Sequence, residues 1–243
     1  MKQTAEARDP RHRDSLRRMA EEVRALLFDF DGLLIDTEVP AFRAWSEVYS
    51  QYGQELTLAD WADSLGTIGG FDPVTHLEEL LGAPLEDRDV VVDRRLQRKL
   101  ALVAEEKLRP GVESYLERAL QLNITVAIVS SDHDEWITSN LARLGRADGW
   151  TCITCANGDK HRAKPLPILY EETLENLGLR ADEAVAFEDS PNGIAAAKAA
   201  GLFCVAVPND LTRSLDLSEA DLYLDSFEAN PLDDVLRAVA NRR

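Results

Sequence analysis

The sequence has few cysteines and no long apolar run, and each shortage argues against a class of protein. Three cysteines among 243 residues are odd in number and too few for a disulfide framework, which fits a reducing compartment. No run reaches the roughly 18 apolar residues that a membrane-spanning helix needs. Residues 1–22 are charged throughout and lack the apolar centre of a signal peptide. We therefore expect a cytoplasmic protein with a charged N-terminal extension over 1–22 and no membrane span.

Basic side chains are also scarce. The chain carries 27 Lys and Arg against 44 Asp and Glu, which gives a formal net charge of −17. A surface this acidic repels the phosphates of nucleic acids and of anionic lipids, so neither is an expected partner. The composition of the whole chain, 45% hydrophobic and 29% charged, is typical of a soluble folded protein. The length allows a core domain and a smaller second domain.

Cys152 and Cys155 form a CxxC pair, a spacing that zinc sites use. A structural zinc site needs four ligands, and only His161 lies near this pair in the sequence. The flanking residues, 150–156, read as a strand, which would place the two thiols on opposite faces. We therefore expect both cysteines to fill structural positions.

Apolar runs rich in branched residues alternate with longer helical patterns. Strands are predicted at residues 23–28, 124–129, 184–187, 202–207 and, more weakly, 221–224. Helices are predicted between them at residues 112–122, 134–144, 167–177 and 193–200. Strands separated by helices indicate an α/β fold, a Rossmann-like parallel sheet with helices on both faces. Ligands of such sheets bind at the carboxyl ends of the strands.

One segment interrupts the alternation. Residues 39–107 contain helical patterns and no convincing strand, with a glycine-containing loop at 66–70. The helices are expected at 41–52, 58–65, 74–81 and 87–106. Arg109-Pro110-Gly111 then returns the chain to the sheet pattern. We expect a helical cap at 39–107, inserted into a core made of 23–38 and 108–243, in a position that suits a lid.

Two aspartates directly follow the first predicted strand, in the segment Asp29-Phe30-Asp31-Gly32. Gly32 permits a bend and the close approach of a ligand. A buried carboxylate pair needs a cation or a proton to compensate its charge. Taken alone, the segment is equally consistent with a simple Asp/Gly turn.

Further polar residues arrive in order at later strand ends. Ser130 and Ser131 follow the second strand ahead of a helix, where hydroxyl and amide groups can receive phosphate oxygens, although capping explains them as well. Lys164 precedes a proline-initiated helix, and Glu188-Asp189 ends another strand, where carboxylates can bind a hard cation. Because the carboxyl ends of parallel strands meet at one edge of the sheet, the set is expected to form one site.

The order of these motifs resembles that of the haloacid dehalogenase-like hydrolase superfamily, in its helical-cap branch of phosphatases and β-phosphoglucomutase-like enzymes. The resemblance covers about residues 23–225. It implies that Asp29 is a nucleophile that forms an aspartyl-phosphate and that Asp31 protonates the leaving oxygen and then activates water. Ser130 and Lys164 would hold the phosphoryl oxygens with help from the Ser131 amide.

The resemblance also implies a magnesium ion. Its ligands would be the Asp29 carboxylate, the Asp31 carbonyl and Asp189, with Glu188 supporting the site or a metal-bound water. Metal and lysine would together supply the positive charge that phosphoryl transfer needs and that the acidic surface lacks.

Several positions distinguish among relatives. Asp31 argues against carbon–halogen cleavage, because dehalogenase relatives lack the second aspartate. Phosphonate-cleaving relatives need a cap lysine for an imine, whereas this cap has only Lys99 and Lys107, both late in the segment. Relatives often carry an aspartate where this chain has Ile168, which affects the local geometry of the lysine motif rather than the function.

The mutase alternative is weakened at two positions. The mutase-like group carries a histidine where this chain has Ala41, and a cap-loop arginine near Gly69 or Gly70. A non-catalytic protein on the same fold is a second alternative, which the retention of all the acidic and lysine motifs argues against. Hydrolysis of a small phosphorylated metabolite, of the sugar or polyol phosphate class, is therefore the expected activity, by a monomer or small homo-oligomer.

The substrate-facing side of the cap is only partly readable. Trp45, Trp61 and Phe71 could line a pocket, but aromatic residues at helical spacing more often pack in a core. Thr37 and Glu38, at the hinge into the cap, are the better candidates for contact with substrate.

Overall fold

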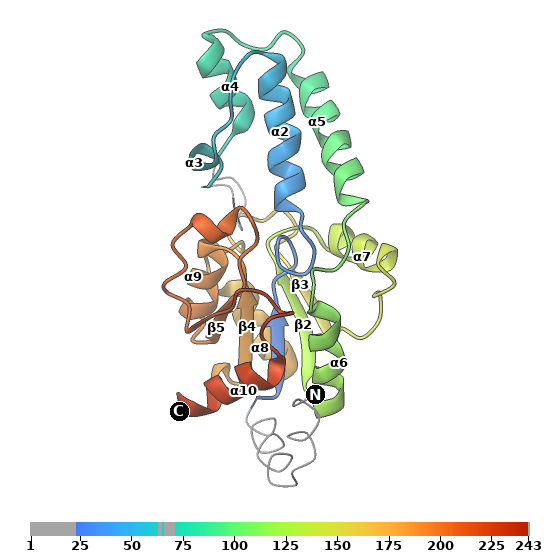
Figure 1. Cartoon of the computed structure of the whole chain (residues 1–243), viewed down its shortest axis with the longest axis vertical. Helices are drawn as coiled ribbons and strands as arrows, with labels where there is room; N and C mark the ends of the chain where they lie inside the picture. Colours follow the sequence, from blue (N-terminus) through green and yellow to red (C-terminus); the bar gives the residue numbers. More distant parts are fainter. Residues whose placement is uncertain (1–22, 63–64, 66–70, 243) are drawn as a thin grey trace.

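The computed structural model describes residues 23–62, 65 and 71–242 (Figure 1). Its centre is a six-stranded sheet in the order β3-β2-β1-β4-β5-β6, in which every neighbouring pair is parallel. The strands are β1 (Ala25–Phe28), β2 (Thr125–Ser130), β3 (Cys152–Cys155), β4 (Ala184–Glu188), β5 (Phe203–Ala206) and β6 (Leu222–Tyr223). All predicted strands are present, with ends shifted by at most two residues.

Helices cover both faces of the sheet. They are α6 (Val112–Leu122), α7 (Asp134–Arg143), α8 (Ile168–Leu177), α9 (Pro191–Ala199) and α10 (Leu232–Asn241), with short 3-10 turns η3 (Ala181–Glu183) and η4 (Thr212–Ser214). Leu26 and Phe28 of β1 face the apolar cluster under α6, α7 and α10, whereas Ala25 and Leu27 face the cluster under α8 and α9. Alternate strand residues are thus buried on opposite faces. The predicted α/β fold class is confirmed.

The cysteine pair has the predicted structural role. Cys155 belongs to the cluster on one face of the sheet, and Cys152 packs against the cluster on the other. Both thiols are free, and burial raises the pKa of Cys155 to about 12. The two cysteines therefore lie on opposite faces of the sheet, as predicted. In these positions they cannot bind one metal ion together.

The insert is helical and has a core of its own. It consists of α2 (Glu38–Gln51), α3 (Leu58–Trp61), α4 (Pro73–Leu81) and α5 (Arg88–Val103). Trp45 and Trp61 are 2% and 6% exposed in its apolar cluster, and Phe71 packs against them. Their packing role, the favoured of the two interpretations, is therefore confirmed. Figure 1 places these helices beyond the carboxyl edge of the sheet.

The cap meets the core at several contacts. Leu211, which follows β5, belongs to the cap cluster, and the Asn192 side chain donates a hydrogen bond to the Leu65 carbonyl at 2.8 Å. The domain boundaries at 38/39 and 107/108 stay a prediction. The predicted extension over 1–22 and the loop residues Gly66, Gly69 and Gly70 lie outside the described residues. Among the helices that the structure describes, none is both long and apolar enough to cross a bilayer.

Candidate active site

The predicted site residues meet at the carboxyl edge of the sheet. The register pairs Phe28 of β1 with Ile128 of β2 and Phe187 of β4. The next residues along these three strands are therefore neighbours, so Asp29 lies between the end of β2 and Glu188. β1 is a buried strand of four apolar residues, and polar residues follow it at its carboxyl end. Ligands of parallel sheets bind at this edge.

Lys164 is the centre of this group. Its ammonium contacts Asp29 Oδ1 at 2.5 Å and Glu188 Oε1 at 2.7 Å, and it donates to the Val129 carbonyl at 2.7 Å. The side chain is only 1% exposed, and burial would lower its pKa. The charges of Asp29 and Glu188 outweigh this effect and raise the pKa of Lys164, so the ammonium stays charged.

Glu188 is enclosed on its other sides. The Tyr170 hydroxyl donates to Oε1 at 2.5 Å, while Oε2 has no hydrogen-bond partner among the residues that the structure describes. A Cβ on Gly193 would lie 1.9 Å from Oε2, so only glycine fits at this position of α9. A buried carboxylate oxygen without a donor is costly, which indicates a position for an additional ligand.

Three carboxylates lie together at this point. Asp29, Glu188 and Asp189 each place an oxygen within 4.8 Å of the others, and all three side chains are buried. Burial raises the pKa of Asp29 and Asp189 well above the usual value, and the neighbouring carboxylates raise both further. One ammonium among three carboxylates leaves two negative charges uncompensated, so the group fits a divalent cation with oxygen ligands.

Asp31 stands apart from this acidic group. Its Oδ1 accepts the Trp136 indole N–H at 2.8 Å, and its Oδ2 lies 3.4 Å from the Ser130 hydroxyl. Burial raises the pKa of Asp31, and the nearby Asp132 raises it further, whereas Lys99 and the Trp136 bond lower it. Two aspartates separated by one residue therefore occupy different environments, because the chain bends between them.

The bend depends on Gly32. Its φ of +79° is in the left-handed region, and a Cβ there would lie 2.3 Å from Asp189 Oδ2. Its carbonyl accepts bonds from Arg109 at 2.7 Å and from Asn209 at 3.3 Å. Asn209 also donates to Asp189 Oδ2 at 2.7 Å. Arg109 and Asn209, from two other segments, thus hold the loop after β1 next to the Asp189 carboxylate.

The remaining predicted residues border the site. The Ser131 hydroxyl accepts the Lys164 backbone N–H at 3.2 Å. Thr37 is buried, and its hydroxyl has no hydrogen-bond partner among the residues that the structure describes. Glu38 lies against the Gly32 loop, and burial raises its pKa to about 7. Ala41, in contrast, belongs to the cap cluster, so its position contributes to cap packing.

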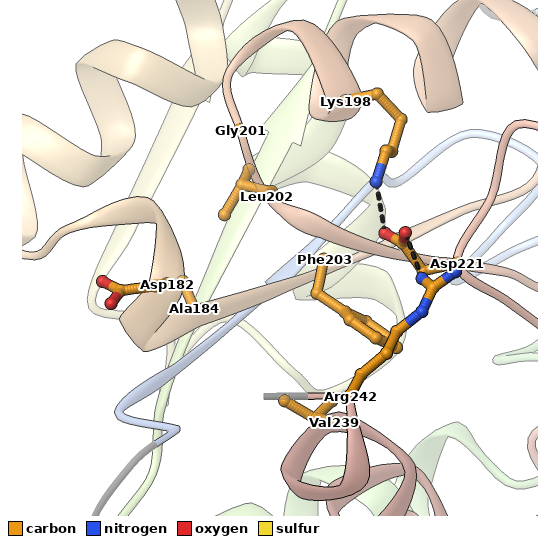
Figure 2. Close-up of a pocket in the computed structure, with 9 residues that line it drawn as sticks. All are labelled: Asp182, Ala184, Lys198, Gly201, Leu202, Phe203, Asp221, Val239 and Arg242. Carbon is orange, nitrogen blue, oxygen red and sulfur yellow. Dashed lines mark hydrogen bonds and ion pairs between the residues drawn. The ribbon is translucent and has the colours of Figure 1, made fainter.

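A second hollow lies at the opposite end of the sheet and has different chemistry. Figure 2 shows Lys198 and Arg242 approaching Asp221 from two directions, beside Phe203. The Lys198 ammonium lies 2.6 Å from Asp221 Oδ2, and Arg242 also pairs with Asp221. Both cations already pair with the one Asp221 carboxylate, so the described lining of this hollow offers a phosphate group no unengaged cation.

Sequence reasoning missed four residues of the site. Asn209 follows β5, and the strand-end argument that found Asp29 and Asp189 would have found it as well. Arg109 and Trp136 were missed because each acts from a distant segment, beyond the strand ends. Tyr170 lies inside α8 and reads as an ordinary core aromatic.

Curated proteins are similar to this chain over most of its length. YhcW of Bacillus subtilis strain 168 is 39% identical over 84% of this chain and 92% of its own length. The phosphorylated carbohydrates phosphatase of Thermotoga maritima is 32% identical over 74% of this chain and 82% of its own.

A solved structure and a family model are similar to this chain as well. The CbbY mutant of Rhodobacter sphaeroides, solved with xylulose-(1,5)bisphosphate, is 29% identical with a TM-score of 0.68, over 86% of this chain and 96% of its own. The model of the haloacid dehalogenase-like hydrolases matches residues 23–201. The chain therefore belongs to the haloacid dehalogenase-like hydrolase family.

Proposed function

We propose that this protein is a magnesium-dependent phosphatase that hydrolyses a small phosphorylated metabolite through an aspartyl-phosphate. The observation that carries the proposal is the separation of two buried aspartates. Asp29 lies against Lys164 and the carboxylates of Glu188 and Asp189, while Asp31 lies outside that group and accepts the Trp136 indole N–H. One aspartate is placed to react with phosphorus, and the other to exchange a proton.

In the first step, a carboxylate oxygen of Asp29 forms a bond to phosphorus. The bond between phosphorus and the ester oxygen breaks, and its electron pair stays on the leaving oxygen. Asp31 transfers its proton to that oxygen, so the product leaves as an alcohol. The raised pKa of Asp31, which burial causes, supports this role because it favours the protonated form that an acid needs.

In the second step, water attacks the phosphorus of the aspartyl-phosphate and gives its proton to Asp31. The bond between Asp29 and phosphorus breaks, phosphate leaves and both aspartates return to their starting state. Lys164, Ser130 and the Ser131 amide orient the phosphoryl oxygens throughout, a role that the buried ammonium supports by charge. When bound by Asp29, the Asp31 carbonyl and Asp189, with Glu188 in support, Mg²⁺ would neutralise phosphoryl charge.

The substrate class is proposed to be a sugar or polyol phosphate. Support comes from two relatives, one named for phosphorylated carbohydrates and one solved with a sugar bisphosphate. Thr37 and Glu38 lie at the hinge beside Asp31, where a hydroxyl and a carboxylate can bind substrate hydroxyl groups. We further propose a cytoplasmic monomer or small homo-oligomer that binds neither nucleic acid nor membranes.

A phosphate-release screen tests the proposal. The purified chain is supplied with Mg²⁺ and a panel of sugar phosphates, polyol phosphates and nucleotides, before and after chelation. We expect release from sugar or polyol phosphates that chelation abolishes. Release that survives thorough metal removal would refute the metal-dependent mechanism. Conversion of β-glucose 1-phosphate to glucose 6-phosphate without free phosphate, after priming by a bisphosphate, would replace the phosphatase by a mutase.

A further inference from the structure

Trp136 connects the acid/base aspartate to the cap. From α7, its indole N–H donates to Asp31 Oδ1 at 2.8 Å. The face of the same ring carries the ammonium of Lys99 from cap helix α5, with Nζ 4.9 Å from the ring centroid. A cation on the ring face and an acceptor at the ring edge are both favourable placements for an indole. One side chain therefore has its orientation fixed from both domains.

Helix α7 is itself bound to the end of α5. The Arg143 guanidinium donates to the carbonyls of Ala104 and Glu106, at 3.2 and 2.7 Å, directly after α5 ends. Arg143 also donates to Asn140 Oδ1 at 3.2 Å, and the Asn140 amide donates to the Trp136 carbonyl at 2.9 Å. This chain of hydrogen bonds fixes the backbone of Trp136 relative to the cap helix.

The direction of the indole bond has a chemical consequence for Asp31. An indole nitrogen can only donate, so the carboxyl oxygen that it binds is the acceptor, and this bond favours the form in which the other oxygen carries the proton. Oδ1 is that acceptor, which leaves Oδ2 to carry the transferable proton. Oδ2 accepts only a long contact from the Ser130 hydroxyl, at 3.4 Å, and that hydroxyl can rotate away, so Oδ2 is free to carry a proton for transfer.

We propose that Trp136 is a positioning residue, which holds Oδ1 of Asp31 so that Oδ2 delivers the proton to the leaving oxygen. This inference rests on the proposed phosphatase function. Proton delivery matters most for esters whose leaving oxygen is basic, because such an oxygen cannot depart as an anion. Loss of the indole bond should therefore slow poor leaving groups much more than good ones. A merely structural tryptophan would slow both equally.

The test uses a series of aryl phosphates that runs from para-nitrophenyl to phenyl phosphate, with kcat/KM measured for each in the presence of Mg²⁺. Trp136→Phe keeps an aromatic ring for Lys99 and removes the N–H. We expect its kcat/KM to fall about tenfold further for phenyl phosphate than for para-nitrophenyl phosphate, which is within the usual contribution of general acid catalysis. Benzothienylalanine at position 136 keeps the bicyclic shape, lacks the N–H, and should reproduce the effect if the phenylalanine variant unfolds.

Trp150→Phe is the matched control. Trp150 is also half-buried on the apolar core and donates its indole N–H, to the Arg146 carbonyl at 3.0 Å, but it lies at the opposite end of the sheet. Its variant should keep the leaving-group dependence of the wild-type chain. An equal loss across the series at position 136 would overturn the inference while leaving the phosphatase intact. A wild-type chain inactive on every aryl phosphate would overturn the proposed function, and the inference with it.

Discussion

Lys164 explains how a site with so many carboxylates can accept a phosphate ester. Its side chain is buried, and its ammonium contacts Asp29, Glu188 and the Val129 carbonyl. The contact with Lys164 also orients Asp29. It fixes Oδ1 of the carboxylate and therefore also sets the position of Oδ2. One side chain thus offsets part of the carboxylate charge and orients the proposed nucleophile.

The packing of Glu188 against Gly193 gives a first prediction. Gly193→Ala would place a methyl group 1.9 Å from Glu188 Oε2, so that a buried carboxylate next to Lys164 must move. We expect phosphatase activity to fall at least about tenfold and the free energy of unfolding to fall by about 1–3 kcal/mol, the usual effect of overpacking. Steady-state kinetics and urea unfolding measure the two effects.

Gly145→Ala is the control for this substitution. Its Cβ would meet open space, although its φ of +68° disfavours alanine. Stability should decrease through backbone strain while activity stays at the wild-type level. Unchanged activity in the Gly193 variant would show that the position of Glu188 is not needed.

At the scale of elements, the hinge between cap and core is fixed by Arg109. Its guanidinium donates to the carbonyls of Gly32, Val207 and Pro208, at 2.7, 3.1 and 2.6 Å. These carbonyls belong to the loop after β1 and the loop after β5. The planar guanidinium of Arg109 therefore joins the second linker of the cap to two loops of the site.

Arg109→Lys should accordingly destabilise the fold. A lysine keeps the charge but cannot reach three carbonyls from one planar group. We expect a loss of about 1–3 kcal/mol in the free energy of unfolding, measured by urea denaturation, because buried carbonyls lose their donors. Arg118→Lys is the control, since Arg118 forms a two-point pair with Asp233 that is partly exposed to solvent. Equal losses in the two variants would contradict a special role for Arg109.

At the scale of the whole molecule, the acidic site makes the metal-free fold sensitive to pH. Burial raises the pKa of Asp189, and that of Glu38 to about 7. A carboxyl group with a raised pKa in the folded state favours folding at low pH, where it is protonated in both states. That contribution is lost as pH rises through the folded pKa.

Thermal unfolding of the metal-free protein at pH 5 and pH 8 tests this linkage. Asp189→Asn removes one of the repelling charges, so its Tm should exceed that of the wild type by more at pH 8 than at pH 5. Mg²⁺ should raise the Tm of the wild type and have little effect on the variant. Asp216→Asn is the control, because Asp216 is exposed and its hydrogen bonds with Ser218 lower its pKa. A Tm gap at position 189 that is larger at pH 5 would contradict this account.

The sequence predicted the elements better than the contacts between them. Buried parallel strands are short apolar runs, so β1 and β4 are visible directly, and the polar residues at their carboxyl ends are Asp29 and Glu188. The strand order is not encoded by any periodicity. Trp136 and Arg109 reach the site only because α7 and the second cap linker fold back over the sheet edge. Ala41 shows the same limit, since its burial in the cap follows from helix packing.

The phosphorylated form of Asp29 is the most direct test of the central claim. Asp31→Asn should still transfer phosphate from para-nitrophenyl phosphate, whose leaving oxygen needs no proton, but should hydrolyse the aspartyl-phosphate slowly. After acid quenching, mass spectrometry should find one phosphoryl group on the peptide that contains Asp29, and none when Asp29→Asn is added. Turnover without a phosphorylated protein, or a phosphoryl group on another residue, would contradict the account.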